Sequence, residues 1–233
     1  VLDCGDGVSH TVPVYEGFAV QSAIQRSDVA GRDVTAYLQL LLRRAGYNFH
    51  TSAEREVVRQ VKEAVCYVAV NPEEEERAHQ KGALGLRGKA AGGRNAVYKL
   101  PDGQQIELGP ECFRAPEILF QPDRVGLEYE GVHQLLAGSI RRADLDLRAS
   151  LYSNIVLAGG STLFKRFGGR LLHELKTAAP PDVKIKILAP EDRRYSTWTG
   201  GSILASLTTF RQMWVSREEY AEYGPRILQK RCF

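Results

Sequence analysis

The sequence lacks the features that mark zinc-binding, disulfide-rich and membrane-spanning proteins. Its 233 residues include four widely separated cysteines without the spacing of a zinc site or a disulfide framework, namely Cys4, Cys66, Cys112 and Cys232. No apolar run approaches the roughly 20 residues that a helix needs to cross a bilayer. We therefore expect a protein of a reducing, intracellular compartment, without membrane insertion.

The sequence also lacks a strong excess of either charge and an initiating methionine. Its 31 basic and 28 acidic residues leave a net charge of +3, which is too small to predict nucleic-acid binding. Its one methionine is Met213, and Val1-Leu2-Asp3 has the pattern of the end of a buried strand. We therefore expect the chain to be part of a longer protein that continues before Val1.

The apolar patterns predict strands that alternate with helices, which is typical of an α/β fold. Helical spacing follows Asp33, an expected N-cap, as far as Gly46, and a capping box predicts a second helix after Thr51. Further helices are expected near 116–120, 132–140, 147–152 and 167–175. Strands are expected near 1–3, 8–14, 66–70, 97–100, 105–108, 154–157 and 183–188.

Residues 72–96 differ in composition from the rest of the chain. An acidic run from Glu73 to Glu76 is followed by glycine, alanine and basic residues with little apolar surface to bury. We expect this segment to be a mobile surface insertion.

Two glycine-rich turns follow expected strands, Asp3-Cys4-Gly5-Asp6-Gly7 and Gly159-Gly160-Ser161-Thr162. Glycine allows backbone N–H groups to approach an anion closely, and a helix that begins after the turn adds a favourable dipole. A single turn of this kind is more often only a turn. Together, facing one groove, the two turns predict a nucleotide site.

Three side chains near the first turn each have two interpretations. Asp3 ends a buried strand, where an ionised carboxylate needs a partner, and magnesium bound through water is one such partner. Asp6 either stabilises an Asx-turn or contacts a nucleotide. His10 is either a structural strand residue or a residue that positions a water molecule.

A series of short motifs occurs in the same order as in actins, so the chain resembles the actin family. The first motif, Val1 to His10 with Pro13-Val14-Tyr15-Glu16-Gly17, is similar to the second phosphate loop of actins and the strand after it. The others are Gly31-Arg32-Asp33-Val34-Thr35, Lys62-Glu63, Cys66-Tyr67, Leu100-Pro101-Asp102-Gly103, Phe113-Arg114-Ala115-Pro116-Glu117, Gly159-Gly160-Ser161-Thr162, Tyr195-Ser196-Thr197-Trp198, Gly200 to Leu207 and Lys230-Arg231-Cys232-Phe233.

The resemblance implies a partial actin-like ATPase fold, with a ribonuclease-H-like core, an inserted subdomain and a missing N-terminal part. Residues 1–30 and 119–186 would form the large-domain core, similar to actin subdomain 3. Residues 31–118 would form the inserted subdomain 4, with the insertion 72–96. Residues 187–233 would be the C-terminal part of the small domain, subdomain 1, and would leave apolar surface exposed.

The resemblance also implies a site for ATP or ADP with Mg²⁺. The residues implied to contact the phosphates are Gly5, Asp6, Gly7 and Val8. Asp3 would hold the hydration shell of the magnesium ion, and His10 would help to position the attacking water. The residues implied on the base and ribose are Arg59, Lys62 and Glu63. The opposite side of the adenine pocket would consist of Gly160, Ser161, Leu163, Phe164 and Arg194.

For the intact protein, the resemblance implies slow ATP hydrolysis by an in-line water, without covalent chemistry. The first phosphate loop would precede Val1, so we expect this chain alone to bind ATP weakly or not at all. Self-association into filaments is implied, through the exposed loop 121–132 and through residues 195–207 with the C-terminal helix.

Within the family, residues 71–72, 154–157, 161–165 and 183–185 are more similar to centractins, the branch that builds the short filament of dynactin, than to conventional actins. This similarity implies a cytoplasmic cytoskeletal protein whose partners are dynactin subunits and dynein. The alternatives are a conventional actin-like filament protein and an ATP-switched scaffold of a chromatin-remodelling complex. A sugar-kinase-type phosphotransferase is a third, for which we find no motif of an acceptor-hydroxyl base.

Overall fold

The structure is a computed structural model that describes residues 1–83 and 96–231. It contains two compact units, Val1–Arg194 and Tyr195–Phe233, which are described separately. In the part of the chain that the structure describes, no helix combines the length and the hydrophobicity that a membrane crossing requires.

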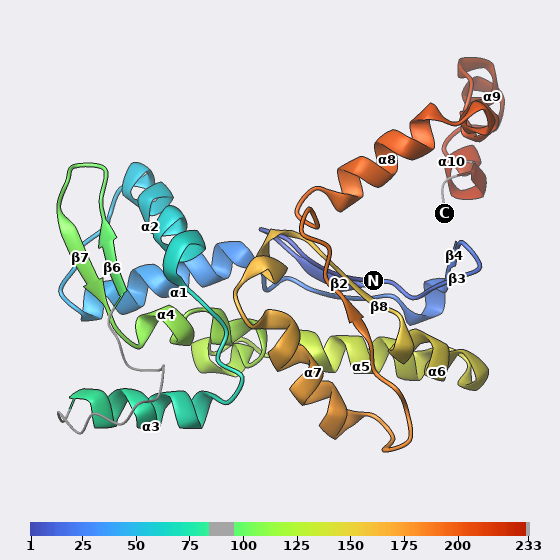
Figure 1. Ribbon diagram of the computed structural model, residues 1–233. Coiled ribbons are helices and arrows are strands. Elements are labelled where there is room, and N and C mark those ends of the chain that lie inside the picture. The colour runs from blue at the N-terminus through green and yellow to red at the C-terminus, as the bar shows by residue number, and fades with distance from the viewer. Residues whose placement is uncertain (84–95, 232–233) are drawn as a thin grey trace. The chain divides into compact units, whose positions relative to one another are not determined.

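A five-stranded sheet in the order β5-β2-β1-β8-β9 organises the first unit (Figure 1). Its strands are β1 (Leu2–Cys4), β2 (Ser9–Thr11), β5 (Gln25–Ser27), β8 (Ile155–Ala158) and β9 (Ile187–Leu188). β1 runs antiparallel to β2 and parallel to β8. Leu2 and Cys4 are buried while Asp3 between them is half-buried, because successive side chains of a strand point to opposite faces.

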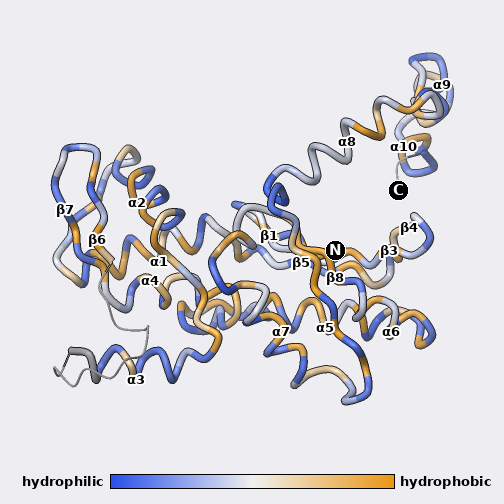
Figure 2. The backbone as a smooth tube through the Cα atoms, in the orientation of Figure 1, coloured by the Kyte–Doolittle hydropathy of each residue, from blue (hydrophilic) through white to orange (hydrophobic). Residues whose placement is uncertain are grey.

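Three helices lie together beside this sheet (Figure 1). α5 (Val132–Arg142) contacts β2 and β5, and both α6 (Leu145–Ser153) and α7 (Phe167–Ala178) contact α5. The shorter elements are the hairpin of β3 (Val14–Tyr15) and β4 (Phe18–Ala19) and the 3-10 helices η1 (Gln21–Ala23), η2 (Pro116–Leu119), η3 (Pro122–Val125) and η4 (Gly160–Leu163). Figure 2 shows that hydrophobic residues follow one another along β8, as expected of a strand inside a sheet.

The segment inserted between β5 and η2 forms a second group of elements. They are α1 (Gly31–Arg44), α2 (Ser52–Val65), α3 (Pro72–Ala83), β6 (Ala96–Lys99), β7 (Gln105–Leu108) and α4 (Glu111–Arg114). The predicted capping box of α2 is confirmed, since the Thr51 hydroxyl accepts from the backbone N–H of Glu54. The strands predicted near 97–100 and 105–108 are confirmed as well, and they form a hairpin in which β6 is antiparallel to β7.

The start of α1 differs from the prediction. Ala30, not Asp33, is the N-cap, and the Asp33 carboxylate instead accepts from the backbone N–H of Ala30 at 2.9 Å. The helix starts earlier because the N–H groups of Gly31 and Arg32 find acceptors outside the helix, the carbonyl oxygens of Gly5 and Asp6. Gly46 ends the helix region with a φ of 97°, in agreement with its predicted role.

Two predicted segments have a different structure. Residues 72–83 of the expected mobile insertion form α3, which is held by ion pairs such as Glu76 with Arg114, while residues 84–95 lie outside the described residues. The segment 66–70 is not a strand, because its backbone hydrogen bonds go to two separate segments. The backbone N–H of Tyr67 donates to the Cys112 carbonyl oxygen, and that of Val68 donates to the Lys165 carbonyl oxygen.

The C-terminal boundary of the first unit also differs from the prediction. β9 pairs with β8 in a parallel arrangement, so residues 187–194 lie in the first unit and not in the C-terminal part. β9 covers only Ile187–Leu188 of the predicted strand 183–188.

A buried ion pair joins η2 to α7 within the first unit. Arg170 of α7 and Glu117 of η2 are both 1% exposed, and two hydrogen bonds of 2.9 and 2.7 Å connect them. The same guanidinium donates to the carbonyl oxygen of Ala69 and to Glu174, and lies 4.8 Å from the centre of the Phe120 ring. Such a pair is stabilised when further hydrogen bonds satisfy the remaining donors, and here all three guanidinium nitrogens donate to an acceptor.

The second unit is helical in its described part. It consists of α8 (Ser196–Ser206), η5 (Thr208–Met213), α9 (Arg217–Tyr223) and α10 (Arg226–Arg231). Ser216 caps α9 through a capping box, and Arg231 pairs with Glu219 at 2.6 Å. None of the residues of α8 is buried, and Trp198 is 75% exposed, so the expected exposed apolar surface is confirmed.

Candidate functional site

The two glycine-rich turns predicted from the sequence lie against each other. They follow β1 and β8, which are parallel neighbours in which Asp3 is the partner of Ala158. The Ser161 hydroxyl donates to the carbonyl oxygen of Gly5 at 2.7 Å. The expected proximity is therefore confirmed, and both turns lie at the carboxyl ends of adjacent parallel strands, where α/β proteins bind ligands.

The first turn spans residues 5–8 and joins β1 to β2. Its ends are fixed by a hydrogen bond of 3.1 Å from the Gly5 N–H to the Val8 carbonyl oxygen, while Asp6 and Gly7 at its tip are exposed. An anion can therefore approach the backbone at the tip. The Asp6 carboxylate faces Arg32 of α1 at 3.3 Å, an exposed pair that contributes about 0 to 1 kcal/mol at most.

Asp3 and His10 lie opposite each other in the middle of β1 and of β2. They are direct partners in the antiparallel pairing, so their side chains share one face of the sheet. Both residues are half-buried. A carboxylate and an imidazole on one face, beside the exposed turn, are consistent with a site for a hydrated cation and a positioned water.

Behind the turn, Cys4 and Ser9 form a buried polar contact. The Cys4 thiol and the Ser9 hydroxyl are 2.9 Å apart, and the hydroxyl donates to the Val29 carbonyl oxygen at 2.7 Å. Burial raises the pKa of the Cys4 thiol to about 11, so it remains a neutral thiol near pH 7. This contact ties the base of the turn to the segment that leads into α1.

The N-terminus of α1 contacts both turns through Gly31. Its N–H donates to the Gly5 carbonyl oxygen at 3.0 Å, and its own carbonyl oxygen accepts from the Lys62 ammonium at 2.8 Å. A Cβ atom at this position would lie 2.6 Å from the Ser161 hydroxyl oxygen, so only glycine fits without movement. Gly5, Gly31, Lys62 and Ser161 therefore form one small cluster.

Lys62 is placed at the site by α2, and its side chain is buried. Burial lowers the pKa of its ammonium group, which is stabilised by the hydrogen bond to the Gly31 carbonyl oxygen. In this structure Lys62 therefore joins α2 to the start of α1, and its expected contact with base and ribose remains a prediction.

The other two site residues predicted on α2 lie on its more exposed face. Arg59 forms ion pairs with Glu63, one turn further along the helix, and with Glu56, one turn before. The side chain of Glu63 is 45% exposed, so the expected contacts of Arg59 and Glu63 with a nucleotide remain predictions.

The second turn passes from Gly159 into η4. Gly159 has a φ of 85° and a ψ of 150°, a conformation that is essentially restricted to glycine. A Cβ atom there would overlap the Cys4 carbonyl group and the Asp3 carboxylate, so the close approach of the two turns requires glycine. Ser161 is buried in this turn, whereas Leu163 is 40% exposed and Phe164 packs partly against the core.

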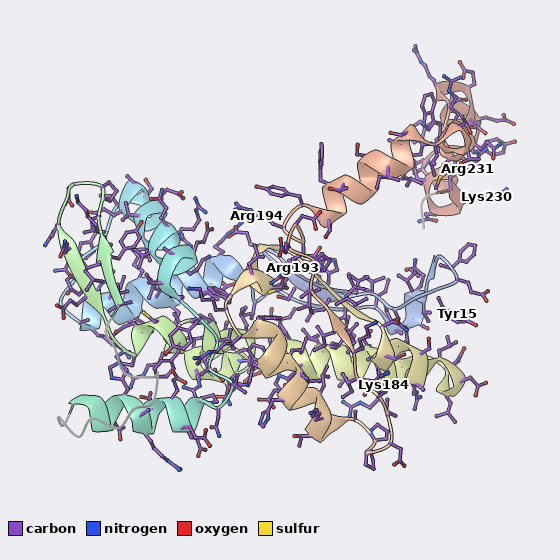
Figure 3. All side chains as sticks on the ribbon, in the orientation of Figure 1. Tyr15, Lys184, Arg193, Arg194, Lys230 and Arg231 are labelled. Atoms are coloured by element: carbon purple, nitrogen blue, oxygen red, sulfur yellow. The ribbon has the colours of Figure 1, made fainter. Side chains whose placement is uncertain are left out.

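The segment after β9 brings two arginines to the second turn (Figure 3). The backbone carbonyl oxygen of Arg193 accepts from the Gly159 N–H at 3.0 Å. Arg194, one of the predicted site residues, follows directly, and its Cγ lies 3.9 Å from the position of a Cβ atom on Gly160. Figure 3 shows Arg193 and Arg194 on neighbouring positions of this segment.

The structure adds three residues to the site that the sequence analysis did not assign. Gly31 joins the two turns, Arg32 pairs with Asp6, and Arg193 bonds to the second turn. Gly31 and Arg32 were part of a family motif, but no local pattern indicates their partners. Arg193 carries no sequence signal apart from its position next to Arg194.

The residues present fit a nucleotide with magnesium. Magnesium usually keeps several waters and is held by one or two carboxylates together with phosphate oxygens, so the single carboxylate of Asp3 beside the turn is sufficient. The exposed backbone at Asp6 and Gly7 suits phosphates, and the apolar surface of Leu163 and Phe164 suits a base.

The chain is similar to known proteins over nearly its whole length. The model of the actin family matches residues 1–233. An "Actin-like protein" of Neurospora crassa is 60% identical over 228 residues, which are 98% of this chain and 58% of that relative. The chain thus spans little more than half the length of the relative. With the mixed sheet, the inserted segment and the paired glycine turns in the order expected of this fold, the chain belongs to the actin family and forms part of an actin-like ATPase fold.

Proposed function

We propose that the longer protein to which this chain belongs binds ATP with Mg²⁺, and that the chain supplies one side of the nucleotide site. The observation that supports this proposal is the direct contact of the two glycine-rich turns, through the Ser161 hydroxyl and the Gly5 carbonyl oxygen. Because of this contact, the exposed tip of the first turn and the 159–164 segment lie side by side. One nucleotide can then contact the first segment with its phosphates and the second with its base.

The residue roles in this proposal follow the chemistry of each group. Backbone groups of the first turn contact the phosphates at Gly5, Asp6, Gly7 and Val8. Asp3 holds the magnesium ion through water, and His10 on the same face helps to position the attacking water. The residues on the base and ribose are Arg59, Lys62, Glu63, Gly160, Ser161, Leu163, Phe164 and Arg194.

The proposed activity of the whole protein is slow hydrolysis of ATP. Phosphoryl transfer to water needs positioning and charge stabilisation more than covalent chemistry, and magnesium, when bound, supplies positive charge for the phosphates. Asp3 and His10 are the residues of this chain suited to organise water there. The first phosphate loop is expected in the part of the protein before Val1, so this chain alone should bind ATP weakly or not at all.

We also propose that the whole protein forms filaments and is a centractin-like subunit of dynactin, in the cytoplasmic cytoskeleton, where it supports dynein-driven transport. The support is the similarity of residues 71–72, 154–157, 161–165 and 183–185 to centractins. The loop 121–132 has an exposed stretch at 128–130, and α8 exposes Trp198 and Ile203, which gives both proposed filament contacts accessible surface.

The nucleotide proposal predicts a magnesium-dependent effect of Asp3. In the full-length protein, numbered as here, Asp3→Asn should raise the Kd of ATP measured with magnesium by about tenfold or more, because it removes the charge that orders the metal-bound water. With excess EDTA in place of magnesium, the Kd should be unchanged. Isothermal titration calorimetry measures both values.

Asp182→Asn is the matched control for Asp3, since Asp182 is an exposed aspartate in the connection between α7 and β9. It should leave both values unchanged. Wild-type full-length protein without measurable affinity for ATP would overturn the nucleotide proposal, and tight binding of magnesium-ATP by residues 1–233 alone would overturn the expectation that the site is incomplete in this chain.

The filament proposal predicts that the full-length protein sediments with ATP and magnesium. Cosedimentation at increasing protein concentration should show a threshold above which short polymers appear in the pellet. A protein that stays monomeric at all concentrations would favour the alternative of an ATP-switched scaffold. Pull-down of dynactin subunits tests the centractin assignment separately.

A further inference from the structure

Arg193 connects the second turn to the segment after β9 through its whole guanidinium group. Its Nε donates to the Thr162 hydroxyl oxygen at 3.0 Å, and one terminal nitrogen donates to the Thr162 carbonyl oxygen, also at 3.0 Å. The other terminal nitrogen donates to the Pro190 carbonyl oxygen at 2.7 Å. A longer hydrogen bond of 3.5 Å reaches the Ala189 carbonyl oxygen, so the side chain bridges the second turn and the segment after β9.

Thr162 connects Arg193 to Gly159 at the start of the second turn. It is fully buried, and its hydroxyl donates to the Gly159 carbonyl oxygen at 2.7 Å while it accepts from Arg193. Because the hydroxyl has one hydrogen and that hydrogen is committed to Gly159, its orientation is fixed from both sides. The backbone oxygen of Arg193 accepts from the N–H of the same Gly159. Arg193 thus holds both ends of the 159–162 segment.

The bonds of Arg193 also determine where its neighbour lies. Arg194 follows in the chain, and its Cγ is close to Gly160. Movement of the Arg193 backbone would therefore shift Arg194 and the turn relative to each other. Gly160, Ser161 and Arg194 belong to the proposed adenine side of the nucleotide site.

We propose that Arg193 is a positioning residue for the adenine side of the site, which it orders through Thr162 and Gly159 without contacting the nucleotide. This inference rests on the proposed binding of ATP. Lysine should not replace it, because a single ammonium on a flexible chain does not reproduce the planar fork that bonds the hydroxyl and the carbonyl of Thr162 together.

The test uses full-length protein, nucleotide-free and then titrated with magnesium-ATP and magnesium-ADP. Arg193→Lys and Thr162→Val should each raise the Kd of ATP by about tenfold, since each breaks charge-assisted hydrogen bonds. ADP should lose affinity by the same factor, because the change is on the adenine side. The Kd of ATP for the double variant should be about the same as for either single variant, since both substitutions act through one contact.

Two control variants separate positioning from general loss of structure. Arg148→Lys changes another half-buried arginine, which lies on α6 and donates to the Ala143 carbonyl oxygen at the end of α5, and it should leave both Kd values unchanged. Thr162→Ser keeps the hydroxyl and should retain wild-type affinity. The melting temperature of nucleotide-free Arg193→Lys should fall no further than that of Arg148→Lys.

Each remaining outcome contradicts the inference in an identifiable way. Wild-type affinity in Arg193→Lys, or additive losses in the double variant, overturns it while the nucleotide proposal stands. A changed ratio of ADP to ATP affinity shows an effect on the phosphates and also overturns it. A wild-type protein that binds neither nucleotide overturns the proposed function and this inference with it. If Arg193→Lys does not fold, the comparison of Thr162→Val with Thr162→Ser decides.

Discussion

Replacement of Gly159 by alanine is expected to abolish ATP binding by the full-length protein and to destabilise it by about 2 to 4 kcal/mol. Two independent features of the structure cause this. The backbone at Gly159 has a φ of 85°, which side chains with a Cβ atom rarely adopt. The added methyl group would also overlap the Cys4 carbonyl group and the Asp3 carboxylate, so the two turns would have to separate.

The measurements for Gly159→Ala are the Kd of ATP by calorimetry and the urea midpoint of the nucleotide-free protein. Gly168→Ala is the matched control, because Gly168 lies in α7 with only an ordinary contact of 4.0 Å at its Cβ position. Alanine should be tolerated there or should stabilise the helix by about 0.5 to 1 kcal/mol. A Gly159→Ala protein that binds ATP like wild type would show that the close contact of the turns is not needed for the site.

Glu117→Ala is expected to cost about 3 to 5 kcal/mol of stability. It would leave the guanidinium of Arg170 buried, charged and without its bidentate partner. Glu174 remains as a second carboxylate partner of Arg170. It is 26% exposed and accepts only from the Arg170 Nε, so it replaces little of what is lost. The urea midpoint of the full-length protein measures the change.

The control for Glu117 is an exposed pair of the same chemistry. Arg77 and Glu73 on α3 are 69% and 81% exposed, so Glu73→Ala should change stability by less than about 1 kcal/mol. Glu117→Leu combined with Arg170→Met should recover much of the loss, because an apolar pair needs no charge compensation. A double variant as unstable as Glu117→Ala would contradict the charge argument and point to lost packing.

Sequence patterns predicted the elements that are stabilised by contacts between residues close together in the sequence. The capping box after Thr51 depends on bonds between residues three apart, and the hairpin of β6 and β7 depends on the turn at Pro101-Asp102-Gly103. Both glycine turns were identified, because glycines that follow an apolar strand are visible in the sequence itself. Asp33 shows where local patterns failed, since external acceptors for Gly31 and Arg32 moved the start of α1.

The sequence by itself therefore determined the family, the α/β class and the two turns that carry the proposed site. Only the tertiary structure decided that these turns touch, and that Gly31, Lys62, Thr162 and Arg193 hold them in place. The physical reason is that these contacts depend on the parallel register of β1 with β8, which joins residues from opposite ends of the first unit. A local pattern of apolar and polar residues contains no information about that register, whereas the hydrogen bonds of the folded chain fix it.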